Sequence, residues 1–319
     1  MLSRTADNLF WVSRYVERAE NTARMLDINL QMALLPHGKK SLEQTWRASL
    51  AISELQSRYD ERYDTLSPRD VLAFMVTDPK NPSSIYSCLS SAREAARAVR
   101  GSLTTEVWET HNTTWLELQR LVANDLPQRD PSEFFEWVKF RSHLSRGVTR
   151  GTMLDDEALH FLGIGTHLER ADNTARLLDV RFHEYVDDDE PDPEAIDSYR
   201  EFYHWAAILR SVSAFEIYRK VYRDVVTPAR VAELLIVRKD MPRSLASSVH
   251  AVLGDLNRVS NDRSGETERL AGQLDADLRY GRIDDILAAG LHPWLTQFLR
   301  RINDLGNRVS ADFLVPLSV

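Results

Sequence analysis

The chain carries nearly the same charged sequence twice. YVERAENTARMLD occupies residues 15–27, and HLERADNTARLLD occupies residues 167–179, 152 positions later. In both copies apolar residues recur at spacings of three and four, which is the period of an amphipathic helix. A chain that repeats a helical stretch at about half its length is typical of a duplicated fold. The sequence therefore predicts two diverged halves, residues 1–150 and 151–319.

Two narrow apolar seams predict how the halves meet. The first seam is Leu9, Val12, Val16, Ala19, Ala23, Leu26 and Leu30, and the second is Phe161, Ile164, Leu168, Ala171, Ala175, Leu178 and Phe182. Small residues at the centre of a seam let a partner helix approach to about 8 Å. We therefore expect Ala19 and Ala23 to lie near Ala171 and Ala175, about a pseudo-twofold axis.

The repeat extends beyond these helices. SPRDVLAFMVTDPKNPSSI, residues 67–85, aligns with TPARVAELLIVRKDMPRSL, residues 227–245. Long stretches without proline have apolar residues at helical spacing. Between these stretches, prolines follow residues that can cap a helix start. The sequence predicts an all-α helical bundle in one domain, residues 1–319, with six helices in each half. The expected helices include 42–63, 68–76, 195–223 and 282–310, the last with a break at Pro293.

Composition limits the class of protein. Cys88 is the only cysteine, so no disulfide can form within the chain, and it reads as a small buried residue. The net charge of −8 gives no basis for nucleic-acid binding, and no apolar run reaches the length of a membrane span. Without a secretory signal at residues 1–11, we expect a cytoplasmic protein. We interpret the acidic run 187–194 as a solvated linker between helices. The sequence is compatible with a monomer and with a homo-oligomer.

A polar stripe flanks each seam. The first stripe is Glu17, Glu20, Arg24 and Asp27, and the second is Glu169, Asp172, Arg176 and Asp179, with Arg18, Arg170, Asn21 and Asn173 further round the helices. One interpretation is a lattice of ion pairs that sets the register of the halves. Another is a pocket in which Arg14, Arg18, Arg24 and Arg176 hold a carboxylate or phosphate. An arginine interrupts each stripe, which disfavours a metal site made of carboxylates.

Other patterns carry weaker signals. Two Glu-x-x-His patterns, Glu157 to His160 and Glu201 to His204, have the spacing of bundle metal sites but are expected by chance in this composition. No phosphate loop or dinucleotide fingerprint occurs, so we predict neither a metal nor another cofactor. The helix start at residues 81–84, NPSS, is either a cap or an anion site made of backbone N–H groups.

The stretches MLSRTADNLFWVSRYVERAENTARMLD, NPSSIYSCLSSAREAARAVR, LTTEVWETHN and HLERADNTARLLD together resemble the bacterial alpha-E domain family. The resemblance implies a helical domain encoded beside circularly permuted ATP-grasp amide ligases and transglutaminase-like proteases, in peptide or amide-bond metabolism. Its motif falls on Ser3, Arg4, Asn8, Arg14, Glu17, Arg18, Glu20, Asn21, Arg24, Asn81, Ser83, Ser84, Arg93, Arg97, Glu169, Arg170, Asp172 and Arg176.

Three functions are open at this point. The leading hypothesis is a non-catalytic partner, or substrate-presenting subunit, of an ATP-grasp ligase, because no nucleophile–base pair or phosphate loop occurs. The second is an enzyme of amide-bond formation or cleavage in which Glu17 or Glu169 is a general acid or base. That role requires an enclosed cleft and a raised pKa. The third is a metal-dependent helical-bundle enzyme.

Overall fold

The computed structural model describes residues 1–34, 39–187 and 196–314, and every regular element in these ranges is helical. The helices of the first half are α1 Ser3–Ala33, α2 Lys39–Ile52, α3 Gln56–Asp60, α4 Pro68–Val76, α5 Ile85–Ala98, the 3-10 turn Arg100–Ser102, α6 Thr105–Ala123, α7 Leu126–Arg129 and α8 Pro131–Thr152. Those of the second half are α9 Glu157–Asp187, α10 Ile196–Ser211, α11 Phe215–Tyr222, α12 Pro228–Ile236, α13 Leu245–Val259, α14 Gly265–Tyr280, α15 Ile283–Ala289 and α16 Leu291–Phe313. The all-α prediction is confirmed.

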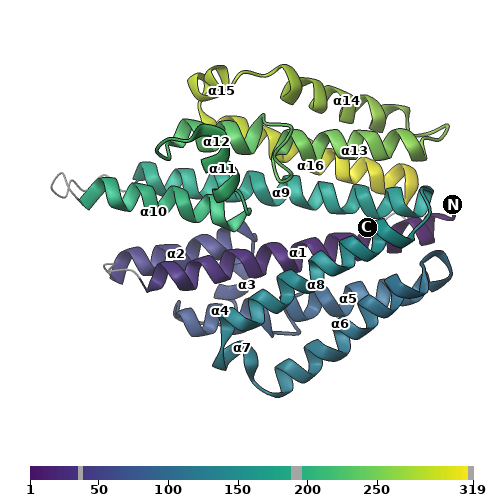
Figure 1. Cartoon of the computed structure of the whole chain (residues 1–319), viewed down its shortest axis with the longest axis horizontal. Coiled ribbons are helices and arrows are strands. Elements are labelled where there is room, and N and C mark those ends of the chain that lie inside the picture. Colours follow the sequence, from purple (N-terminus) through teal and green to yellow (C-terminus); the bar gives the residue numbers. More distant parts are fainter. Residues whose placement is uncertain (35–38, 188–195, 315–319) are drawn as a thin grey trace.

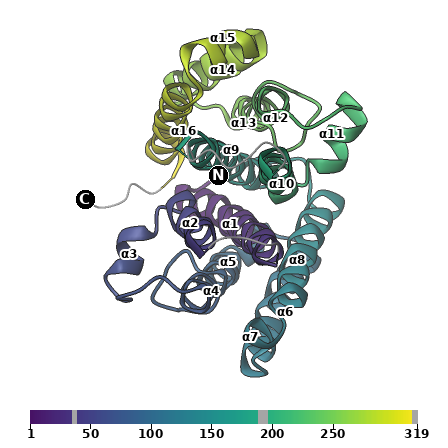
Figure 2. The same ribbon diagram turned by 90° about the vertical axis from the view of Figure 1, so that its left-hand side faces the viewer.

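The two long helices that carry the charged sequence lie together at the centre of the molecule. α1 and α9 run side by side in the same direction, with α1–α8 largely on one side and α9–α16 on the other (Figures 1 and 2). Ala19, Ala23, Ala171 and Ala175 are fully buried. Packing α1 against α5 and α8, and α9 against α13 and α16, buries the remaining faces of both central helices.

Glycine permits the closest approach of these central helices. A Cβ atom built on Gly165 of α9 would lie 2.3 Å from the backbone oxygen of Phe10 and 2.3 Å from Ser13 Oγ, both on α1. Gly163 faces the opposite side, where a Cβ would lie 2.1 Å from the carboxylate of Asp255 on α13. The Gly-x-Gly sequence is therefore a packing device between three helices, and no strand precedes it in the described chain.

Contacts recur across the α1–α9 boundary in reciprocal pairs. Arg24 of α1 donates to Ser213 Oγ at 2.7 Å, and Arg176 of α9 forms an ion pair with Glu54. Glu54 and Ser213 both have left-handed backbone, with φ of 54° at each. The residue after each of them donates its N–H five residues back, from Leu55 to Leu50 O and from Ala214 to Leu209 O. In each half, the residue at the helix break thus contacts the central helix of the other half.

Side-chain caps explain many helix starts. Ser67, Ser84, Thr104, Asp130, Thr227 and Ser244 each accept a hydrogen bond from the backbone N–H three residues later. Such a bond satisfies a donor that has no partner within the helix. Pro68, Pro131 and Pro228 begin three of these helices, where the missing N–H costs nothing.

Three helix predictions were wrong. The expected helix 42–63 is split by Glu54 into α2 and α3, and 195–223 is split by Ser213 into α10 and α11. The break expected at Pro293 lies at Gly290, whose φ of 94° suits glycine, while Pro293 sits in the first turn of α16. Each described half has eight α-helices, two more than expected. The acidic run at 188–194 lies outside the described residues.

None of the helices in the described ranges combines the length and apolar character needed to cross a membrane. The long helices α1 and α9 instead bury charged side chains between them.

Candidate functional site

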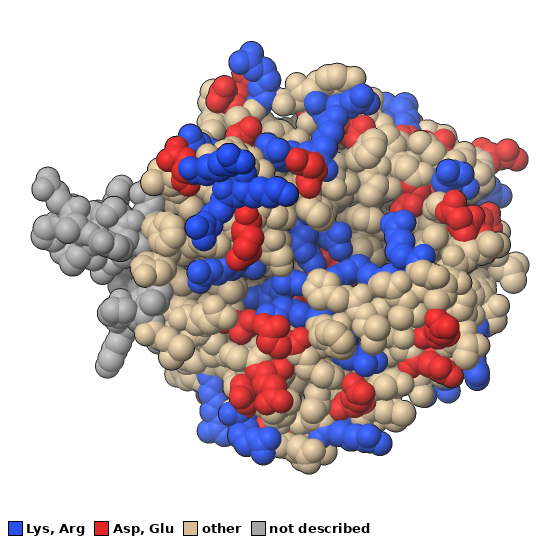
Figure 3. Space-filling model, viewed as in Figure 1, with Lys and Arg blue, Asp and Glu red and all other residues tan. Residues whose placement is uncertain are grey.

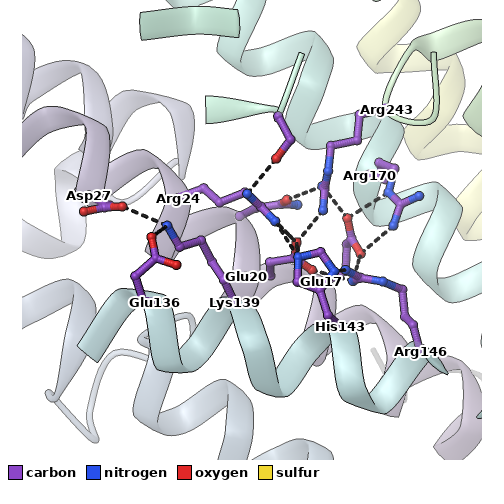
Figure 4. A network of polar contacts seen from close by, with 12 residues as sticks. Glu17, Glu20, Arg24, Asp27, Glu136, Lys139, His143, Arg146, Arg170 and Arg243 are labelled. Carbon is purple, nitrogen blue, oxygen red and sulfur yellow. Dashed lines mark hydrogen bonds and ion pairs between the residues drawn. The ribbon is translucent and has the colours of Figure 1, made fainter. Parts of the chain in front are cut away.

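Glu17 is the centre of a buried network on α1. Its carboxylate accepts two hydrogen bonds from Arg170 of α9, one to each oxygen and each 2.9 Å long. Arg243, in the segment between α12 and α13, donates to the same carboxylate at 2.8 Å, and Arg146 of α8 donates at 3.1 Å. Three helices and a loop thus converge on one carboxylate that is 1% exposed (Figure 4).

Glu20 repeats this pattern one turn along α1. Its carboxylate accepts hydrogen bonds from Arg24 at 2.9 Å and from Arg243 at 2.6 Å, and it also pairs with Arg146. Arg243 and Arg146 therefore each bridge the two glutamates. Asn21 Oδ1 accepts a further hydrogen bond from Arg243 at 2.9 Å. The buried Nδ2 of the same side chain has no hydrogen-bond partner in the described part of the chain.

The network holds more positive than negative charge. Two carboxylates, Glu17 and Glu20, face four guanidinium groups, those of Arg24, Arg146, Arg170 and Arg243. His143 lies between two of them, with Nε2 3.0 Å from Arg24 and Nδ1 3.1 Å from Arg146. Burial and the neighbouring guanidiniums lower the pKa of His143, so the ring adds no further positive charge. On the face of the molecule that Figure 3 shows, Lys and Arg side chains gather in and around a hollow.

Both network glutamates are ionised at neutral pH. Burial alone would raise the pKa of Glu17, but Arg170, Arg243 and Arg146 outweigh it and hold the pKa well below its usual range. Burial likewise opposes ionisation of Glu20, and Arg243 and Arg146 bring its pKa to about 2. A general acid requires the opposite shift, whereas ionised carboxylates such as these hold the arginines around them.

Glu169, the counterpart of Glu17 on α9, has a smaller set of partners. Arg18 donates to it at 2.6 Å and 3.0 Å, and Arg14 donates at 2.8 Å. Burial opposes ionisation of Glu169, but these two arginines lower its pKa. The pairs Arg18–Glu169 and Arg170–Glu17 are reciprocal, since each motif arginine binds the glutamate of the other copy.

The remaining stripe residues bind partners outside the Glu17 network. Asp172 and Arg176 form two hydrogen bonds of 2.7 Å and 2.9 Å within α9, and burial raises the pKa of Asp172 against that pairing. Asp27 of α1 accepts from Lys139 of α8 at 2.8 Å. Asn173 is half-buried and lies outside the network. In the described ranges, different side chains therefore contact the two stripes.

The predicted site at residues 81–84 is a turn and helix cap. Asn81 donates to Phe74 O at 3.0 Å and accepts from the N–H of Ser83, and Ser84 caps α5. Arg93 donates to Asn112 at 3.2 Å, and Arg97 forms an exposed ion pair. These residues lie on α5 and the turn before it, and none takes part in the Glu17 network.

A cleft of about 250 Å³ borders the network between α1, α6, α8 and α9. We call it the α8–α9 cleft; its polar lining includes Glu17, His111, Arg146, Arg150, His167 and Arg170. Burial lowers the pKa of His111 and of His167 to about 4, so both imidazoles are neutral at pH 7. His167 Nδ1 must donate to Gly163 O, 2.9 Å away, because a carbonyl only accepts. Its Nε2 is therefore a hydrogen-bond acceptor.

Within the described ranges, no group of three His, Cys, Asp or Glu side chains could hold a metal ion. His160 contacts Asp255 at 2.9 Å and Asp155 at 3.3 Å. The side chain of Glu201, from the second Glu-x-x-His pattern, lies outside the described residues. Cys88 is fully buried, and burial raises the pKa of its thiol to about 12, which leaves it unreactive.

Sequence reasoning missed Arg146, His143 and Arg243. Arg243 had a signal, because the aligned segments read Pro82-Ser83-Ser84 and Pro242-Arg243-Ser244, so an arginine replaces a serine only in the second half. Arg146 and His143 lie on α8, where no repeated motif marks them. Their role depends on how α8 crosses α1, which the residue pattern does not reveal.

Comparison with known proteins places these residues in a wider group. The sequence model of the Alpha-E family, a predicted alpha-helical domain with a conserved ER motif, matches residues 1–314. Uncharacterized proteins of Mycobacterium bovis and Mycobacterium tuberculosis are 24% identical over 328 residues, covering 94% of this chain and 35% of each relative. The chain thus spans about a third of the length of the curated relatives it matches. No solved structure matches it significantly.

Proposed function

The chain belongs to the Alpha-E family, and on that premise we propose that it is a non-catalytic, substrate-presenting partner of an ATP-grasp amide ligase. In this role it holds an anionic substrate and offers it to the ligase, which supplies ATP and the bond-forming chemistry.

The surplus of guanidinium groups beside the α8–α9 cleft is the observation that carries this proposal. Arg146 and Arg170 line the cleft and belong to a network in which four guanidiniums face two carboxylates. A buried network with excess positive charge is stabilised by an incoming anion. Its glutamates have lowered pKa values, so the arrangement suits binding of an anion better than proton transfer.

The length of the relatives supports a role alongside other protein. The mycobacterial proteins align with this chain over 35% of their own length, so an Alpha-E region there shares its polypeptide with additional sequence. A region joined to other sequence acts at high effective concentration on whatever that sequence binds or makes. A separate chain achieves the same effect by forming a complex.

We also infer that residues 1–150 and 151–319 descend from one doubled unit within a single domain, related by a pseudo-twofold axis. The reciprocal pairs Arg18–Glu169 and Arg170–Glu17 support this, as do the matching left-handed breaks at residues 54 and 213. On this view only the Glu17 side gained the extra arginines, so one of two equivalent positions became the binding site.

Co-purification tests the proposed partnership. The chain and an ATP-grasp ligase of the kind that the family resemblance implies should elute together in size-exclusion chromatography, and the chain should raise ligase turnover, measured as ADP release. Arg146→Glu, which reverses charge at the part-exposed edge of the network, should reduce the stimulation. Arg120→Glu, an exposed change on α6 away from the cleft, is the matched control.

Two results together would count against the proposal: no complex at micromolar concentrations, and ligase turnover unchanged by the chain. If the Arg146→Glu and Arg120→Glu variants stimulated the ligase equally, the cationic network would have no part in the stimulation.

Catalysis by Glu17 or Glu169 has less support. Glu17 does line a cleft, as that hypothesis requires, but its pKa and that of Glu169 are lowered and not raised.

A further inference from the structure

Arg150 stands apart from the other arginines of the α8–α9 cleft. It lies in the last turn of α8, four residues after Arg146, so both guanidiniums occupy one face of that helix. Arg146 and Arg170 are already bound to Glu17. Arg150 is exposed and forms no hydrogen bond or ion pair with the described part of the chain. The Arg150 charge favours ionisation of Asp255, but its guanidinium makes no hydrogen bond there. The cleft therefore offers one planar fork with free hydrogen-bond donors beside two forks that bind Glu17.

The neutral imidazoles add hydrogen-bonding character without adding charge. His167 Nε2 is an acceptor, because Nδ1 donates to Gly163 O. His111 has Ser145 Oγ, 3.5 Å away, as its only hydrogen-bond partner in the described residues. An acceptor at the wall of a cationic cleft favours a ligand that carries an N–H group as well as an anion.

The rest of the wall is apolar. Val12, Val16, Leu159 and Leu162 line the cleft from α1 and α9. A volume of about 250 Å³ falls below the range of pockets for drug-sized ligands, so it suits a molecule of amino-acid size better than a nucleotide.

We propose that the α8–α9 cleft binds the carboxylate of an N-acylated amino acid, such as the last residue of a short peptide. The Arg150 fork holds the carboxylate in bidentate fashion, with Arg146 adding positive potential from one turn away. His167 Nε2 accepts the amide N–H, and the valines and leucines cover the side chain. A single uncommitted fork matches a planar monoanion better than a dianionic phosphate.

An N-acylated amino acid would be the substrate class of the proposed function. The biological role of the site therefore rests on that function. Binding itself requires only the isolated protein. Loss of the ligase complex would therefore leave the site intact, and failure of the site would leave the complex to be judged by co-purification.

Isothermal titration with N-acetyl-L-leucine tests the proposal. We expect saturable binding, absent with N-acetyl-L-leucinamide, which keeps the amide and side chain but lacks the carboxylate. Arg150→Ala should weaken binding about tenfold or more, as expected for loss of a charge-assisted bidentate contact. Arg150→Lys should recover only part of the affinity, because an ammonium keeps the charge and loses the fork.

Arg120→Ala is the matched control, since Arg120 is likewise an exposed arginine in the last turn of its helix, α6. It should bind like the unaltered protein, and both alanine variants should melt like it, because neither side chain is buried. Undetectable binding of N-acetyl-L-leucine at millimolar concentration would overturn the proposal. Equal affinity in Arg150→Ala and Arg120→Ala, or inorganic phosphate binding as tightly as N-acetyl-L-leucine, would do so too.

Discussion

Acid should destabilise this protein well above the pH at which its glutamates are protonated, because two imidazoles are buried in neutral form. Burial brings the pKa of His111 and of His167 from 6.5 to about 4. Below pH 6.5 the unfolded chain binds protons at these residues, while the folded protein binds them only near pH 4. The free energy of unfolding therefore falls as the pH falls through this window.

The size of the effect follows from the two pKa shifts. One pKa unit corresponds to about 1.4 kcal/mol, so each imidazole contributes up to about 3 kcal/mol that is lost by pH 4. Between those limits the pair should lower the free energy of unfolding by about 3 kcal/mol per pH unit. Typical domains have about 5–15 kcal/mol in total, so this loss is large.

Urea unfolding followed by tryptophan fluorescence, at several pH values between about 7 and 5, measures this slope. The His111→Gln/His167→Gln double variant cannot take up these protons, so its free energy of unfolding should depend much less on pH, whatever its value at pH 7. Equal pH slopes for the variant and the unaltered protein would refute the reasoning, because the imidazoles would then not be buried in neutral form.

Three further predictions follow from the packing and the network. Glu17→Gln should lower the free energy of unfolding in urea by about 3–5 kcal/mol, because it leaves buried guanidiniums unpaired, whereas Arg243→Met removes surplus charge and should cost less. Gly165→Ala should lower the melting temperature, since its Cβ meets α1 backbone, while Gly147→Ala, with open space around it on α8, should raise stability by about 0.5–1 kcal/mol. Cys88 should resist iodoacetamide in the native protein at pH 8 and react once urea unfolds it, and reaction in the native state would contradict its burial.

Elements specified by local signals were predicted well from the sequence. α4 was expected at 68–76 and runs Pro68–Val76, because a capping serine, an N1 proline and an apolar face agree there. The alanine seams likewise predicted that α1 packs closely against α9, as the structure shows. The ion-pair lattice was also foreseen, as one of several readings of the stripes.

The helix breaks at Glu54 and Ser213 could not be read from the sequence. Left-handed backbone costs an ordinary residue about 1 kcal/mol, and neither position is the glycine or asparagine that usually marks it. These breaks bring each side chain onto an arginine of the opposite central helix. A tertiary contact thus selects the local conformation, and no local pattern predicts it.

The composition of the network was missed for a related reason. The repeated motif showed that Glu17 and Glu20 matter, but two of their arginines come from segments 126 and 223 residues away from Glu20. Only the crossing of α8 over α1 and the turn before α13 bring them in. The surplus charge, on which the functional proposal rests, depends on those distant residues.

The bond between Glu17 and Arg243 joins residues 226 positions apart. At the 5–20 residues per second of bacterial and eukaryotic synthesis, a ribosome takes roughly 10–45 s to make the intervening chain. During that interval the first helix carries an acidic row whose full complement of cations has not yet been made. We therefore expect α1 to reach its final packing only after the second half of the chain has been made.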